Sequence, residues 1–105
     1  MMFITKKKPS SLSAEAYRRL RTNIKLYSEE KPLKTIVITS SIRGEGKSTV
    51  TQNLAYILSQ DESKVLIIDC NLRNPSMHSM FSIENNVGLT DVLSGSCELE
   101  KAIKN

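Results

Sequence analysis

The sequence predicts an α/β fold in which a mainly parallel sheet is flanked by helices. Two short runs, residues 35–39 and residues 64–69, are rich in β-branched and aliphatic side chains, as buried parallel strands are. Between them, residues 47–60 carry apolar side chains at helical spacing. Those side chains are Val50, Leu54, Ile57 and Leu58. A helix between two such strands is a βαβ unit, whose crossover is nearly always right-handed.

Length and composition suit one small folded domain. The chain has 105 residues, of which 39% are hydrophobic and 25% charged, a balance typical of globular rather than disordered chains. The net charge of +4 is concentrated near the start, at Lys6, Lys7, Lys8, Arg18, Arg19, Arg21 and Lys25. This basic cluster fits a solvated face, an acidic partner or anionic lipid. Nucleic acid is not expected, since no aromatic-interleaved basic stripe and no zinc-type spacing occurs.

The cysteines and the N-terminus indicate a cytoplasmic protein. Cys70 and Cys97 are far apart and form no CxxC pair, so reduced thiols are expected. Lys6 interrupts the first apolar residues before a signal peptide can develop. Every apolar run is too short to span a membrane. We therefore expect no transmembrane segment in this chain.

A helix is expected before the first predicted strand. Residues 1–12, with three lysines and Pro9, predict a flexible N-terminal segment. The helix is predicted to begin near Ser13, whose hydroxyl suits an N-cap, and to end before Pro32. Its predicted apolar stripe consists of Leu20, Ile24 and Tyr27.

The pattern becomes looser after residue 69. We expect mostly loop over residues 71–86, with a short helix at 77–81. A second short helix is expected at 90–93, ended by Gly95, and a third from Leu99.

The loop after the first predicted strand matches a phosphate-binding P-loop. The usual pattern is G-x-x-x-x-G-K-[ST], and here Ser41 replaces the first glycine while the rest fits. Gly44 and Gly46 allow backbone angles and a close approach that side chains would prevent, so successive amide groups can face phosphate oxygens. The predicted nucleotide-binding residues are Ser41, Ile42, Arg43, Gly44, Glu45, Gly46, Lys47, Ser48 and Thr49.

Three side chains carry the expected chemistry. Lys47 can reach the β- and γ-phosphates, and the Ser48 hydroxyl can ligate Mg²⁺. Asp69 ends the second predicted strand, where a carboxylate points into the ligand crevice of a parallel sheet. Asp69 can bind Mg²⁺ through water or accept a proton from an attacking hydroxyl. The alternative is that Asp69 only caps the following turn.

The motifs resemble those of a known family. Residues 41–49 and residues 65–75 look like the Walker A and Walker A′ motifs of bacterial tyrosine kinases (BY-kinases), which belong to capsule and exopolysaccharide gene clusters. Residues 85–93 are similar to a segment that follows Walker A′ in that family. The resemblance implies a P-loop kinase domain with ATP and Mg²⁺ as cofactors and autophosphorylation on a C-terminal tyrosine cluster. On this basis Lys47 and Asp69 are the catalytic residues, and Ser48 and Asp69 the metal ligands.

A further motif concerns partners. Glu15-x-x-Arg18-x-x-Arg21 resembles the family's E-x-x-R-x-x-R motif, which contributes to self-association. The alternative is ordinary charge pairing along one helix face. The family also implies a membrane adaptor whose cytoplasmic tail activates the kinase, which would place it peripherally at the inner face of the membrane.

The sequence departs from the family pattern at two points. Asn71 stands where the family usually has a second Walker A′ aspartate, so a negative charge is lost. No Walker B strand and no tyrosine-rich tail follow residue 69. Residues 13–105 are therefore expected to be a partial kinase domain, from a longer kinase or an interrupted gene, that is inactive by itself.

Two rival functions stay open. The first is a partitioning-type P-loop ATPase, although its signature lysine falls at the position of Ile42 here. The second is a non-catalytic nucleotide-binding or oligomerisation module.

Overall fold

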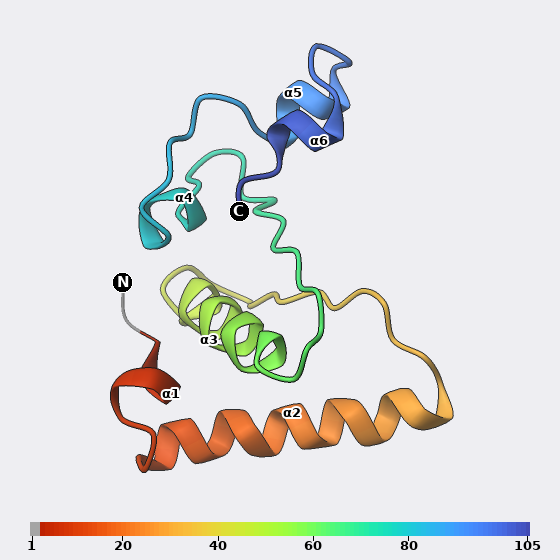
Figure 1. Ribbon diagram of the computed structural model, residues 1–105. Helices are drawn as coiled ribbons and strands as arrows, with labels where there is room; N and C mark the ends of the chain where they lie inside the picture. The colour runs from red at the N-terminus through yellow and green to blue at the C-terminus, as the bar shows by residue number, and fades with distance from the viewer. Residues whose placement is uncertain (1–2) are drawn as a thin grey trace. The chain divides into compact units, whose positions relative to one another are not determined.

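The computed structural model describes residues 3–105, which divide into two compact units (Figure 1). We call residues 3–66 the N-terminal unit and residues 67–105 the C-terminal unit. The first contains α1 (Ile4–Lys7), α2 (Leu12–Glu30) and α3 (Lys47–Ser59). The second contains α4 (Met77–Met80), α5 (Leu89–Leu93) and α6 (Leu99–Ala102).

Helix α2 begins at Leu12, and its cap is Ser11 rather than the predicted Ser13. Ser11 has extended backbone angles, and its hydroxyl accepts a hydrogen bond from the Ala14 amide at 3.1 Å. Ser13 already lies inside the first turn, where it cannot take the N-cap conformation. The helix ends at Glu30, as expected from Pro32, which disfavours helix in the residue before it.

The buried face of α2 differs from the predicted stripe. Ala14 is fully buried, whereas Leu20 is 39% and Tyr27 51% exposed. A small residue at a helix crossing lets two helices approach closely, and α2 packs against α1 and α3. Of the predicted stripe, Ile24 alone is half-buried.

Helix α3 forms as predicted and supplies most of the core. Leu54 and Ile57 are 5% and 2% exposed, as the periodicity indicates. Gln52 and Asn53 are buried as well, at 3% and 2% exposed, and the sequence pattern did not predict this. Figure 1 shows α3 packed over α2, with α1 beside the start of α2.

Helix α1 was not predicted, because a single turn has little propensity of its own. It is held by tertiary contacts with α3. The Ile4 amide donates to Asn53 Oδ1 at 2.8 Å, and the Phe3 ring stacks on Tyr56 with centroids 4.2 Å apart. Part of the segment predicted to be flexible is thus helical; its flexibility stays a prediction, and Met1 and Met2 lie outside the described residues.

The two predicted strands lie in backbone without regular secondary structure, residues 32–40 and 63–70. No strand ladder forms anywhere in residues 3–105, so the structure does not show the predicted sheet. Val37 is 81% and Ile68 58% exposed, so these runs lack the neighbours that would bury them. A strand is stabilised by pairing with other strands, which local sequence preference cannot replace.

The short helices of the C-terminal unit agree with prediction. Helices α4, α5 and α6 form at the expected places. Asp91 accepts a hydrogen bond from the Gly88 amide at 2.9 Å at the start of α5, and Gly95, at φ +82°, follows its end. No helix within residues 3–105 is both long enough and apolar enough to cross a membrane.

Candidate nucleotide-binding site

Two glycines give the loop before α3 its shape. Gly44 and Gly46 have φ values of +78° and +88°, in the left-handed region that other residues rarely adopt. A Cβ atom at either position would meet no atom within 4 Å. The restriction is therefore conformational, and it confirms the predicted need for glycine backbone angles.

A serine and a glutamate tie the two sides of this loop together. The Ser41 amide donates to Glu45 Oε2 at 3.1 Å, and the Ser41 hydroxyl donates to Glu45 Oε1 at 3.4 Å. Ser41 occupies the place of the usual first glycine. Its side chain thus adds a contact that a glycine cannot make.

The lysine of the motif lies against the loop. Lys47 Nζ donates to Ser40 Oγ at 3.0 Å, and Ser40 Oγ donates to the Ile42 carbonyl at 2.9 Å. Lys47 is the first residue of α3, and Ser48 follows in the same turn. The helix N-terminus carries partial positive charge, so the lysine and the amides favour an anion at one place. The loop itself, residues 41–46, is exposed and accessible.

A buried amide that sequence reasoning missed supports this first turn of α3. Asn53 Nδ2 donates to the Thr49 carbonyl at 2.8 Å, while Asn53 Oδ1 accepts from the Ile4 amide. Asn53 thereby links the P-loop helix to α1. The signal in the sequence was a polar residue four positions before Ile57, on the apolar face of the helix.

Asp69 organises the loop that follows it. Its Oδ2 accepts from the Ser76 and Met77 amides at 3.0 and 3.1 Å, and its Oδ1 from the Asn71 amide at 3.0 Å. Partial burial alone would raise the pKa of this carboxyl. The hydrogen bonds from those three amides, with the charge of His78, outweigh burial and hold the pKa below its usual value.

Asp69 therefore performs the capping role that was the alternative in the sequence. Asn71 continues the pattern, since its Oδ1 accepts from the Asn74 amide at 3.3 Å. Asp69 and the P-loop belong to different units. The predicted metal and proton-transfer roles of Asp69 rest on the sequence.

The arginines of the E-x-x-R-x-x-R motif make contacts within the N-terminal unit. Arg18 donates to the Pro9 carbonyl, and Arg21 donates to the Ile57 carbonyl at 3.3 Å. Arg21 also forms an ion pair with Asp61 at 3.4 Å. No ion pair joins Glu15 to either arginine in residues 3–105. The arginines thus fasten α2 to its surroundings instead of pairing along the helix.

Asp61 is the centre of a small charged cluster at the end of α3. Lys25 forms a hydrogen-bonded ion pair with it, beside Arg21. The hydrogen bond from Lys25 has the largest effect on the Asp61 carboxyl and lowers its pKa. Desolvation raises this pKa, but the charges of Arg21 and Lys25 lower it further, so the net shift is downward. The cluster joins α2 to the C-terminal end of α3.

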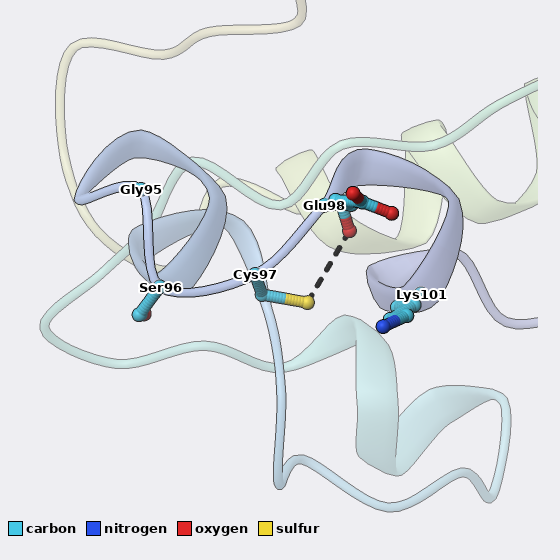
Figure 2. Close-up of a pocket in the computed structure, with 5 residues that line it drawn as sticks. All are labelled: Gly95, Ser96, Cys97, Glu98 and Lys101. Carbon is cyan, nitrogen blue, oxygen red and sulfur yellow. Dashed lines mark hydrogen bonds between the residues drawn. The ribbon is translucent and has the colours of Figure 1, made fainter.

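The C-terminal unit contains a shallow depression of about 240 Å³ (Figure 2). Gly95, Ser96, Cys97, Glu98 and Lys101 line it, and the Cys97 thiol donates to the Glu98 carbonyl at 3.2 Å. None of the predicted site residues belongs to it. Across residues 3–105, no three His, Cys, Asp or Glu side chains gather in a way that could hold a metal ion.

A family model described as "ParA: NUBPL iron-transfer P-loop NTPase" matches residues 32–97. The chain belongs to the ParA family of P-loop NTPases. This establishes the predicted P-loop fold family, although the sheet is not shown in this structure. Iron transfer is part of the description of that family model.

The relatives carry kinase names, which confirms the resemblance. The chain is 47% identical over 96 residues to "Tyrosine-protein kinase YwqD" of Bacillus subtilis, covering 91% of this chain and 40% of the relative. It is 34% identical to "Tyrosine-protein kinase etk" of Escherichia coli K12, covering 97% of this chain and 14% of the relative. The chain therefore spans less than half the length of these relatives.

A solved structure has a similar fold. The chain matches the crystal structure of "the chimerical protein CapA2B2" with a TM-score of 0.84 and 35% sequence identity. The match covers 94% of this chain and 43% of that chain.

Proposed function

We propose that this chain is the nucleotide-binding part of an ATP-dependent protein-tyrosine kinase that regulates capsular or exopolysaccharide synthesis. The observation that carries the proposal is the P-loop: left-handed Gly44 and Gly46 lead into α3, which begins with Lys47 and Ser48. The kinase names of the relatives support the choice of reaction.

The P-loop residues of the N-terminal unit fit the phosphates of Mg²⁺-ATP. The loop amides and the N-terminus of α3 favour phosphate, and Lys47 adds a cation for the β- and γ-phosphates. Hard oxygen ligands suit Mg²⁺, and the Ser48 hydroxyl and the Asp69 carboxylate are such groups. In this proposal Lys47 would stabilise charge on the transferred phosphate. By the family resemblance, Asp69 would hold the metal through water or accept the proton of the attacking hydroxyl.

The proposed partners are a membrane adaptor and further copies of the chain. The adaptor is proposed from the resemblance to bacterial tyrosine kinases, and it would bring the kinase to the inner face of the membrane. Self-association would use Glu15, Arg18 and Arg21. Because Arg21 already binds Asp61, a neighbouring subunit must compete with this contact.

Residues 1–105 expressed alone should bind nucleotide without phosphorylating tyrosine. A Walker B carboxylate is missing from this sequence, and Asn71 replaces a second aspartate, so the charge around Mg²⁺ and the γ-phosphate is incomplete. Mass spectrometry of a tyrosine-rich peptide after incubation with ATP and Mg²⁺ tests this. Transfer that disappears on Lys47→Ala would contradict it.

The decisive experiment is nucleotide binding by calorimetry. Lys47→Ala removes the cation beside the phosphates and should weaken Mg²⁺-nucleotide binding at least tenfold, about 1.4 kcal/mol. Lys64→Ala is the matched control, since it removes an exposed lysine outside the loop. Equal affinity in the wild type and the Lys47 variant would refute the proposed site.

A second function is favoured by the family model, whose description begins with ParA. A partitioning-type ATPase would hydrolyse nucleotide without transferring phosphate to tyrosine. Ile42 occupies the position of the signature lysine of such ATPases, which weighs against it. A third possibility is a non-catalytic module that binds nucleotide and oligomerises. Nucleotide binding, ATP hydrolysis and tyrosine phosphorylation, measured separately, distinguish the three.

A further inference from the structure

Three consecutive lysines lie at the end of α1 and directly after it. Lys6 and Lys7 belong to α1, and Lys8 is the residue directly after it. The Lys8 amide donates a hydrogen bond to the Ile4 carbonyl at 2.8 Å. The Lys8 carbonyl then accepts from the Ser11 amide at 3.0 Å, at the cap of α2. We call Lys6, Lys7, Lys8 and the neighbouring Leu12 the basic corner.

The basic corner is fixed to the body of the N-terminal unit. On one side the Phe3 ring stacks on Tyr56, and the Ile4 amide binds Asn53. On the other side Arg18 donates to the Pro9 carbonyl. None of these contacts uses a lysine side chain of the corner.

The charges of the basic corner are not neutralised. All three lysines are exposed, and within residues 3–105 no hydrogen bond or ion pair holds their ammonium groups. No acidic residue occurs before Glu15 in the sequence. Lys25 is the contrast, because Asp61 compensates its charge.

An exposed apolar residue accompanies these charges. Leu12 is 85% exposed at the first position of α2, next to the turn that carries the lysines. Lysines together with an exposed leucine suit an anionic bilayer, whose headgroups attract ammonium groups while its acyl region accepts an apolar side chain. We infer that the basic corner is a docking surface for anionic lipid, which contacts the membrane directly and independently of any adaptor.

Nucleic acid fits the same surface less well. Single strands are bound by stacking bases on aromatic side chains, and Phe3, which precedes α1, is already stacked on Tyr56. An exposed leucine also has no partner on a phosphate backbone. The chemistry therefore favours lipid.

Vesicle sedimentation of the 105-residue chain tests the inference. Vesicles of phosphatidylcholine with 30% phosphatidylglycerol are compared with pure phosphatidylcholine, at low and high salt. The basic-corner variant is Lys6→Gln/Lys7→Gln/Lys8→Gln. The matched control, Lys31→Gln/Lys34→Gln/Lys64→Gln, removes the same charge from three other exposed positions in the N-terminal unit. Circular dichroism of each variant checks that its helices are retained.

Each basic residue near an anionic surface strengthens binding about fivefold. The wild type should therefore bind the anionic vesicles and lose this binding in high salt, and the basic-corner variant should bind at least tenfold more weakly. The control should lose less than threefold, and Leu12→Ala should weaken binding without changing its salt dependence. No binding to anionic vesicles, or equal losses in both triple variants, would overturn the inference. The inference would also be overturned if an oligonucleotide competed with the vesicles for binding and this competition depended on Lys6, Lys7 and Lys8, because the surface would then bind nucleic acid.

Discussion

Replacing Asn53 should lower the stability of the N-terminal unit, because this side chain links α1 to α3. It is 2% exposed and makes two hydrogen bonds of 2.8 Å, one to the Ile4 amide and one to the Thr49 carbonyl. Asn53→Ala removes both and leaves the Ile4 amide without its acceptor. At about 0.5–1.5 kcal/mol for each hydrogen bond, the variant should lose about 2 kcal/mol of unfolding free energy.

Urea unfolding followed by circular dichroism measures this loss, and hydrogen exchange at the Ile4 amide locates it. The Ile4 amide should exchange faster in Asn53→Ala, because α1 loses its anchor. Asn23→Ala is the matched control, an exposed asparagine on α2 that should change stability by less than about 0.5 kcal/mol. If Asn53→Ala behaves like Asn23→Ala, or if Ile4 exchange is unchanged, the bridging role of Asn53 is wrong.

Two further predictions concern Asp61 and the charged side chains of α2. The pKa of the Asp61 carboxyl is lower in the folded chain than in the unfolded chain, where it is about 3.9. The ion pairs of Asp61 therefore stabilise the fold above about pH 3.9. This stabilisation is lost as the pH falls through the pKa of the folded state. The urea midpoint should therefore drop below about pH 4, and it should drop less in Asp61→Asn; parallel curves for the two proteins would contradict this. In a full-length kinase, the double variant Arg18→Ala/Arg21→Ala should lower the mass of the oligomer measured by light scattering. An unchanged mass would mean that these arginines make contacts within the N-terminal unit and do not support self-association.

The elements that could be predicted from the sequence are those set by nearby residues. Helix α3 follows from its apolar spacing, and the loop before it from two glycines that lie at positive φ. The short helices of the C-terminal unit also agree with local signals, such as Gly95 after α5. In each of these elements the residues that determine the conformation lie within a few positions of one another.

The elements that could not be predicted depend on distant partners. Helix α1 exists where Asn53 and Tyr56 hold it, about fifty positions further along the chain. The buried face of α2 was misjudged because Ala14, a weak apolar signal, is what allows close packing. The runs around Val37 and Ile68 have strand composition, yet no pairing satisfies them here. Composition alone therefore predicts a tendency to form strands, but it does not predict whether these strands pair into a sheet.

The contacts along α3 suggest how the site responds to change elsewhere. Asn53 lies one turn beyond Thr49, so its hydrogen bond reaches the same turn that presents Lys47 and Ser48. Asp61 follows the opposite end of the helix and holds α2 there. The first four amides of a helix have no partner within the helix, so the first turn depends more on other contacts than the interior does. Loss of Asn53 should therefore weaken both stability and nucleotide binding, whereas loss of Asp61 should affect stability and leave the affinity for nucleotide unchanged. Equal effects of both changes on affinity would mean that the nucleotide site depends on the fold of the whole unit rather than on the anchored first turn of α3.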